Sequence, residues 1–352
     1  MAAIVDFFPE CHSRPVVIRF DSFVERVLYD PQFGYYSRPE LRFGKTGDFY
    51  TSPNVHFFFA EILAEQFLQV WELLGCPADF MLLEMGPGDG TLAWQILTTI
   101  RERFSALDRA VRYLGLEASR ALGELQRRKL AVFPRARVLH EHFAGAAVPR
   151  FDGCIFSNEF LDALPFRRFR KSPDGWLEFF VQVQTERLEE CWVPTDWESP
   201  EAAAIPAGGI LEWRDSLASF YEFASAVLSR GIMLHCDYGD RREDMVSEGT
   251  LRTYFQHQWG DDPFVRLGEQ DITASVDFSH LLRLGDQHRF RSRLLGQRQY
   301  LLERGVLEKV ALRFKDRPPD QPDVIQEKLA IKDLILPGGI SDHFKVLIQE
   351  RT

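Results

Sequence analysis

The residues from Glu84 to Gly90, with the sequence EMGPGDG, place three glycines at alternate positions directly after an apolar run. Glycine adopts positive φ angles at no steric cost, so a glycine-rich loop lets backbone N–H groups approach a ligand closely. The spacing of Gly86, Gly88 and Gly90 differs from the G-x-G-x-x-G spacing that is typical of dinucleotide-binding loops. The alternative is a tight turn that binds nothing, and the flanking residues decide between the two.

Two carboxylates are placed to hold a ligand at this loop. Glu84 lies two positions before the first glycine, and Glu117 ends the next apolar run, VRYLGLEA. In an open α/β sheet, ligands bind at the carboxyl ends of the strands, where a carboxylate can accept hydrogen bonds from both hydroxyls of a ribose. The acidic residue beside the glycines suits a cationic group, so adenosine with a cationic amino-acid tail, S-adenosylmethionine, matches both carboxylates. The predicted cofactor residues of this region are Glu84, Gly86, Pro87, Gly88, Gly90 and Glu117.

A second polar cluster, in SNEFLDALP, follows the apolar run FDGCIF. Asn158 and Asp162 could simply cap a helix; for Asp162 the cap and the site are equally open, whereas we favour the site for Glu159. A carboxylate pair would hold a guanidinium by bidentate hydrogen bonds and direct a nitrogen lone pair toward a methyl sulfonium. Because the leaving sulfide is neutral, positioning would supply most of the rate. We therefore predict Asn158, Glu159 and Asp162 as the catalytic residues.

A glycine-containing loop rich in aromatic residues, GKTGDFYTSP, precedes these segments. We predict that Gly47, Asp48 and Thr51 fold over the cofactor as a lid, because loops with glycine hinges often close active sites. The alternative is an Ω-loop that packs on its own side chains.

Two further segments end in polar residues that could border the same crevice. Asp237 and Tyr238 end the apolar run GIMLHCDYG, and GEQDITASVDF supplies Asp271, Thr273 and Asp277. For both segments a role in the site and a structural role as strand-edge or capping residues are equally open.

Strands alternate with helices through most of the chain, which predicts a parallel sheet covered by helices on both faces. Residues 175–184 and 187–195 alternate like antiparallel strands, so we expect an inserted hairpin or small sheet there. Helices are expected over 20–30 and 55–74. The sheet strands are predicted at 79–86, 111–118, 136–140, 151–160, 231–239 and 343–350, with helices at 91–104 and 119–133.

Charge and composition exclude several classes of function. The net charge of −10 and the pI near 5.5 disfavour nucleic acid and anionic membranes as partners. No apolar stretch approaches the length of a membrane span, about 20 residues, and the N-terminus lacks the pattern of a signal peptide. The five cysteines form no CxxC pair and the histidines no HxxxH spacing, so we expect no metal site and a reducing, cytoplasmic location.

The chain resembles the MidA family of class I S-adenosylmethionine-dependent methyltransferases. The resemblance spans about residues 20–349 and rests on GYYSRP, FGKTGDFYTSP, LLEMGPGDGTL, SNEFLDALPFRRF, HCDYGD and GEQDITASVDFSHL, in this order. It implies a Rossmann-like α/β core with a mostly parallel seven-stranded sheet over 78–352, an insertion over about 167–225, and a helical N-terminal cap with a cofactor-covering loop over 1–77.

The same resemblance implies a protein substrate. The family includes a mitochondrial complex I assembly factor that methylates an arginine of a complex I subunit, so symmetric arginine dimethylation of a similar target is the implied activity. It assigns the glycine loop, Glu117 and Gly47–Asp48 to cofactor binding, as proposed above from the residues themselves. It assigns Asn158, Glu159 and Asp162, called the NEF cluster below, to the lining of the site. The chain departs from the family at Thr51–Asn54, where T-x-P-E is usual, and at GGISDHFKVL, where Met-Gly is favoured before FKVL.

Three alternatives compete with this interpretation. The same fold could serve a small-molecule or O-methyltransferase, because a fold does not fix the acceptor. An assembly chaperone could bind S-adenosylmethionine without catalysis. A nicotinamide dehydrogenase is disfavoured by the glycine spacing and the NEF cluster. The aromatic residues Phe57–Phe59, expected at the surface, leave room for a homodimer.

Overall fold

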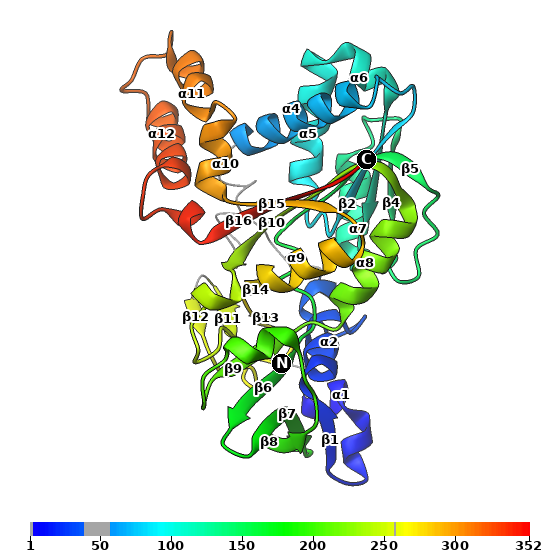
Figure 1. Ribbon diagram of the computed structural model, residues 1–352, viewed down its shortest axis with the longest axis vertical. Coiled ribbons are helices and arrows are strands. Elements are labelled where there is room, and N and C mark those ends of the chain that lie inside the picture. The colour runs from blue at the N-terminus through cyan, green and yellow to red at the C-terminus, as the bar shows by residue number, and fades with distance from the viewer. Residues whose placement is uncertain (1–2, 39–56, 257) are drawn as a thin grey trace.

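The computed structural model describes residues 3–38, 57–256 and 258–352. A mostly parallel sheet lies at the centre of this part of the chain (Figure 1). Its strands are β2 (Phe80–Met85), β3 (Val111–Leu116), β4 (Ala136–Leu139), β5 (Phe151–Asn158), β10 (Leu228–Asp240), β14 (Val276–Asp277), β15 (Arg291–Gly296) and β16 (Phe344–Arg351). They include every sheet strand that the sequence predicted.

The order across this sheet is β15-β16-β10-β5-β2-β3-β4, with β14 paired to the end of β10. β16 runs antiparallel to both of its neighbours, and the other pairs are parallel. The prediction of a mostly parallel α/β sheet is therefore confirmed. Among the described residues the sheet has eight strands, one more than the seven expected, because the short β14 joins it.

Helices cover both faces of this sheet, and alternate residues of each strand enter two different cores. On β2, Leu82 packs with α4 (Phe57–Leu73) and α5 (Thr91–Arg103), whereas Leu83 packs with α8 (Ser216–Val227) and α9 (Phe278–Gln287). This burial on both faces explains why the strands read as continuous apolar runs. The other α-helices described after β2 are α6 (Ser105–Ala110), α7 (Arg120–Lys129), α10 (Gln297–Glu303), α11 (Val306–Phe314) and α12 (Pro322–Ile335).

The predicted insertion is an antiparallel sheet. It contains β6 (Arg167–Ser172), β7 (Gly175–Val183), β8 (Leu188–Thr195) and β9 (Ile210–Trp213), together with β1 (Val16–Arg19) from the start of the chain. β7 is the central strand, because β8 pairs along one edge while β6 and β1 share the other. The described N-terminal segment therefore contributes a strand as well as helices, and its role as a cap over the cofactor stays a prediction.

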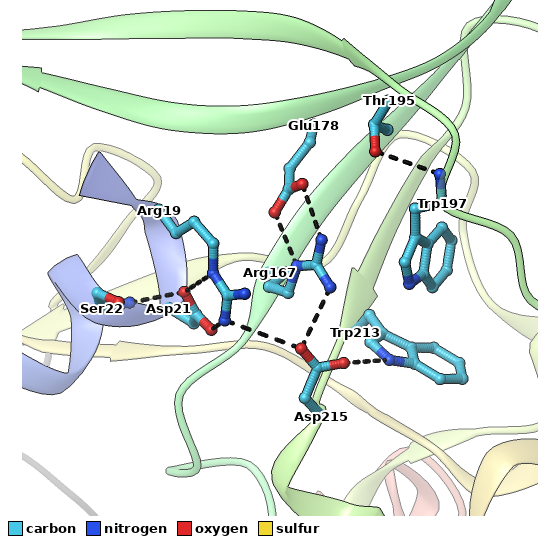
Figure 2. Close-up of polar contacts among 9 residues, drawn as sticks. All are labelled: Arg19, Asp21, Ser22, Arg167, Glu178, Thr195, Trp197, Trp213 and Asp215. Carbon is cyan, nitrogen blue, oxygen red and sulfur yellow. Dashed lines mark hydrogen bonds and ion pairs between the residues drawn. The ribbon is translucent and has the colours of Figure 1, made fainter. Parts of the chain in front are cut away.

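Contacts between α2 (Phe20–Tyr29) and the insertion hold the N-terminal segment in place. Phe20 stacks edge-on against Phe166 with ring centroids 5.5 Å apart, and both are fully buried. Figure 2 shows the polar part of this junction: Arg167 forms a bidentate ion pair with Glu178 at 2.7 and 2.8 Å and also contacts Asp215 at 3.2 Å. The insertion and the first described residues thus share one core.

Helix α4 belongs instead to the core of the central sheet. Phe58 and Phe59 are 2% and 0% exposed, so our expectation of surface aromatic residues here is wrong. The apolar run around them is long enough for a helix buried on most of its circumference. A third, small sheet orders β12 (Gln258–Gly260), β11 (Arg252–Phe255) and β13 (Asp271–Thr273) side by side. No described helix is both long and apolar enough to span a membrane.

Candidate active site

A cavity of about 1060 Å³ opens at the carboxyl ends of the parallel strands. It is bordered by residues at or near the ends of three strands: Met85 on β2, Leu116 on β3 and Tyr238 on β10. Parallel strands end at one edge of a sheet, which is why segments far apart in the sequence meet here. The cavity is large enough for a nucleoside cofactor together with part of a second substrate.

The glycine loop between β2 and α5 forms one wall. Gly86, Gly88 and Gly90 have φ angles of 60°, 56° and 74°, a region that side chains disfavour. A Cβ atom on Gly86 would lie 2.8 Å from Cδ2 of Phe160, so the loop also needs glycine for space. Gly86 and Gly88 border the cavity, which agrees with a loop that approaches a ligand.

Glu117 borders the cavity beside this loop and is 6% exposed. Its Oε1 accepts a hydrogen bond from the backbone N–H of Ser119 at 2.8 Å, and its Oε2 accepts one from Nε2 of Gln126 at 2.9 Å. Burial raises the pKa of this carboxyl to about 7. Each carboxylate oxygen has a second lone pair, so the ionised group can also accept from two ribose hydroxyls.

Glu84 lies behind the loop and is not among the residues that border the cavity. Its Oε2 accepts a hydrogen bond of 2.5 Å from the hydroxyl of Tyr113, and burial raises the pKa of Glu84 to about 8. Pro87 and Gly90 are also set back from the cavity. In the described part of the chain these three predicted cofactor residues do not line the cavity. Gly47, Asp48 and Thr51 lie outside the described residues.

Glu159 and Asp162 border the same cavity from the loop after β5. No helix begins in residues 159–166, which excludes the capping alternative for this cluster. Asn158 does not border the cavity, and its Nδ2 donates to Oε1 of Glu159 at 3.0 Å. Glu159 adopts a φ of 51°, a costly conformation for a residue with a side chain, and such strain is concentrated at functional sites.

Asp162 is 7% exposed, and its two carboxylate oxygens differ. Oδ2 accepts a hydrogen bond from the hydroxyl of Thr273 at 3.1 Å. Oδ1 is buried and has no hydrogen-bond partner among the described residues. Burial raises the pKa of this carboxyl. Asp162 is therefore a largely buried carboxylate at the border of the cavity.

Asp237 holds the backbone of the loop after β5, so of the two roles left open for it, a place in the site or a structural role, it has the structural one. Its Oδ2 accepts hydrogen bonds from the backbone N–H groups of Phe160, Leu161 and Asp162 at 3.2, 2.9 and 3.3 Å. The side chain is fully buried and does not border the cavity. Asp237 thus has a structural role, whereas its neighbour Tyr238 borders the cavity.

The residues of GEQDITASVDF also separate into two groups. Asp271 borders the cavity, and Thr273 holds Asp162. Asp277 instead caps α9, because its Oδ1 accepts from the backbone N–H of Ser279 at 2.9 Å. Both of the alternatives for this segment are therefore realised, each by different residues.

Arg214 holds the backbone of two segments that border the cavity, and the sequence did not reveal this role. Its guanidinium, which is 3% exposed, donates to the carbonyl oxygens of Asp162 at 3.0 Å and Ala274 at 2.6 Å, and also to those of Leu164 and Ser275. Burial lowers the pKa of this group. The inserted segment thereby fixes the backbone of two loops of the site, and no local pattern distinguishes this arginine from a surface one.

Tyr29 and Tyr36 form an aromatic wall that the sequence analysis also missed. Their rings stack with centroids 5.2 Å apart. The hydroxyl of Tyr29 donates to the carbonyl of Ala163 at 2.9 Å, and that of Tyr36 donates to Oδ1 of Asp271 at 3.0 Å. The unusual number of aromatic residues around GYYSRP was the available signal.

Comparisons with known proteins agree with this geometry. Residues 62–294 match a family model described as "Putative S-adenosyl-L-methionine-dependent methyltransferase". The chain is 28% identical to "Protein arginine methyltransferase NDUFAF7, mitochondrial" of Mus musculus and 27% identical to that of Homo sapiens, over 92% of this chain and 78% and 77% of those proteins. A Burkholderia thailandensis crystal structure bound to S-adenosyl-homocysteine is 30% identical with a TM-score of 0.82, covering 95% of this chain and 88% of that one.

The same relatives correct one expectation. Their names place them in mitochondria, which contradicts the cytoplasmic location that we expected. That expectation rested partly on scattered, unpaired cysteines, which indicate a reducing compartment and do not distinguish the cytoplasm from other such compartments.

Proposed function

Because the chain belongs to this family of S-adenosyl-L-methionine-dependent methyltransferases, we propose that it transfers the methyl group to an arginine side chain of a protein. The observation that carries the proposal is the position of Glu159 and Asp162, two carboxylates that border the same cavity as the glycine loop. The names of the curated relatives support the same acceptor.

The described residues fit S-adenosylmethionine as the cofactor. The glycine loop borders the cavity through Gly86 and Gly88, and a Cβ on Gly86 would clash with Phe160. Glu117 presents a carboxylate at the end of the neighbouring strand. When bound, the cofactor supplies an electrophilic methyl group on a positively charged sulfur. We propose that Gly86 and Gly88 contact it through the backbone and that Glu117 accepts from its ribose.

Glu159 and Asp162 would position the acceptor. Two carboxylates hold a planar guanidinium by paired hydrogen bonds and thereby fix the direction of one nitrogen. The two carboxylates would point that nitrogen at the methyl group that the bound cofactor supplies, and a carboxylate would take up the surplus proton of the nitrogen. Burial raises the pKa of Asp162, which makes it a better proton acceptor than a solvent-exposed aspartate. Asn158 acts through Glu159, because its amide holds Oε1 of that residue.

The finer details of the proposal rest on the MidA resemblance. We propose symmetric dimethylation and a target that resembles a subunit of respiratory complex I. Gly47, Asp48 and Thr51 would cover the cofactor, as the sequence predicts.

An acceptor screen tests the proposal. The purified protein is incubated with tritiated S-adenosylmethionine and matched peptides that carry arginine, lysine or citrulline, together with small hydroxyl and carboxyl acceptors. Methyl transfer to the arginine peptide alone is the expected result. Transfer to the small acceptors alone would replace the proposal with a small-molecule methyltransferase, and cofactor binding without transfer to arginine even in a mitochondrial extract would favour the assembly chaperone.

A further inference from the structure

The cavity wall is strongly acidic. Among the described residues that border it, Arg252 is the one Lys or Arg side chain, and its guanidinium lies 5.5 Å from the ring centroid of Trp259. The carboxylates that border it are Glu25, Glu117, Glu141, Glu159, Asp162, Asp240, Asp244, Asp271 and Asp342. Lys345 and Arg298 pair with Asp240 and Asp342, but the other carboxylates outnumber Arg252. Such an excess of negative charge in a cavity attracts cationic ligands and repels anionic ones.

Three of these carboxylates are buried: Glu117, which we assign to the ribose, and two others. Asp162 and Asp271 are 7% and 2% exposed. Asp162 borders the cavity while the hydroxyl of Thr273 donates to its Oδ2 at 3.1 Å, so this carboxylate is fixed in place. Oδ1 of Asp271 is fixed by the hydroxyl of Tyr36 at 3.0 Å, so this carboxylate is held in one orientation.

Aromatic rings bring the two carboxylates into one environment. Tyr254 on β11 is the cross-strand partner of Asp271 on β13. Burial raises the pKa of Tyr29, Tyr36 and Tyr254, and in each case the charges of both Asp162 and Asp271 raise it further. All five side chains border the same cavity.

We propose that Asp271 adds a third carboxylate to the acceptor site of Glu159 and Asp162. With Asp162 and the rings of Tyr29, Tyr36 and Tyr254, it forms the subsite that selects a guanidinium over other cationic groups. A guanidinium is planar and weakly hydrated, so it can lie against aromatic rings while donating in its plane to two carboxylates. The ammonium of lysine is a compact, strongly hydrated charge without this geometry. This subsite deepens the proposed function and rests on it for the identity of the acceptor.

The subsite lies next to the predicted ribose position. The carbonyl oxygen of Tyr36 accepts a hydrogen bond of 2.5 Å from the hydroxyl of Ser119, and the backbone N–H of Ser119 donates to Glu117. The aromatic wall is therefore attached to the residue that we expect to hold the cofactor. A guanidinium in the subsite would lie within the same cavity as the reacting methyl group.

Asp271→Asn is the sharpest test, because an asparagine can still accept from Tyr36 while losing the charge. The experiment titrates the full-length protein, saturated with S-adenosyl-homocysteine, with a peptide that carries arginine and with matched peptides that carry lysine or citrulline. Asp162→Asn is the second variant. Asp244→Asn is the control, since Asp244 borders the same cavity but is exposed.

We expect the wild type and Asp244→Asn to bind the arginine peptide in preference to both other peptides. Asp271→Asn and Asp162→Asn should bind it about ten- to a hundredfold more weakly, the loss of one charged hydrogen bond, with unchanged affinity for S-adenosyl-homocysteine. Equal affinity for the three peptides, or full arginine affinity in Asp271→Asn, would overturn the subsite. Selective binding of arginine without methyl transfer would instead leave the subsite standing and refute the proposed function.

Discussion

Glu117→Gln is the substitution that most directly examines how the chain holds its cofactor. In the wild type, Oε1 of Glu117 accepts from the N–H of Ser119 and Oε2 accepts from Nε2 of Gln126. Glutamine has the same shape, but its NH₂ group must face one of these donors. The amide of Gln126 cannot easily turn to relieve the conflict, because its Nε2 also donates to the carbonyl of Gly88 at 2.6 Å.

The size of the effect follows from the hydrogen bonds at stake. The variant loses one charge-assisted acceptor for a ribose hydroxyl, worth about 1.5–3 kcal/mol. That corresponds to about ten- to a hundredfold weaker binding of S-adenosyl-homocysteine. Because the partner group on the ligand is a hydroxyl, the 2′-deoxy analogue should show a much smaller difference between the wild type and the variant.

The pH dependence gives an independent signature of the same carboxylate. Burial raises the pKa of Glu117 to about 7, so the group loses its charge as the pH falls through neutrality. A protonated carboxyl is a poorer acceptor, and the affinity of the wild type for S-adenosyl-homocysteine should fall by about tenfold from pH 8 to pH 6. Glu117→Gln cannot titrate there, so the difference between the two proteins isolates this group from others near the cavity.

Isothermal titration calorimetry with S-adenosyl-homocysteine measures both effects. Glu141→Gln is the matched control, because Glu141 is an exposed carboxylate that borders the same cavity. The reasoning is refuted if Glu117→Gln binds with wild-type affinity at pH 8, or if the control loses as much affinity as the variant.

Three further variants test other parts of the structure. Gly86→Ala places a Cβ 2.8 Å from Phe160 at a φ of 60°, so urea unfolding should show a loss of about 1–3 kcal/mol and calorimetry weaker S-adenosyl-homocysteine binding; wild-type values for both would contradict this role of the glycine loop. Glu84→Gln removes a carboxyl whose pKa rises on folding to about 8 from its usual 4.5. Such a group stabilises the fold least above pH 8, so the variant should be about 2–5 kcal/mol more stable than the wild type at pH 8.5. This advantage should vanish near pH 4, and a pH-independent difference in denaturant unfolding would count against burial of a titrating group. In Arg214→Lys, the single ammonium group cannot donate to the carbonyls of both Asp162 and Ala274. The kcat/KM for the methyl acceptor should therefore fall by about tenfold or more. Its affinity for S-adenosyl-homocysteine should stay unchanged in calorimetry, and an equal loss of both would mean a general structural defect.

Local sequence patterns predicted the central sheet well, because burial on both faces makes its strands continuous apolar runs between helices. The same patterns missed β1 (Val16–Arg19), whose four residues gain their strand conformation by pairing with β7. They also placed Phe57–Phe59 at the surface, although α4 packs Phe58 and Phe59 into the core of the central sheet. Pairing and packing partners that are distant in sequence leave little local signal, so these features became visible only in the fold.

The candidate site divides in the same way. Gly86, Gly88, Glu117 and the NEF cluster follow strand ends directly, and the rule that parallel strands end at one edge is enough to bring them together. The supports come from elsewhere: Arg214 reaches the site from the insertion. Tyr36 reaches it from the N-terminal segment. Their roles depend on tertiary contacts with residues far along the chain, which the spacing of a motif does not encode.

Mass spectrometry of an arginine peptide after reaction tests the central claim most directly. The peptide is incubated with S-adenosylmethionine and either the wild type or Glu159→Gln, a variant that can still accept from Asn158. The account predicts methyl groups on the guanidinium nitrogens with the wild type and a strongly reduced yield with Glu159→Gln at equal cofactor occupancy. Methylation of another residue type by the wild type, or an undiminished yield with the variant, would contradict it.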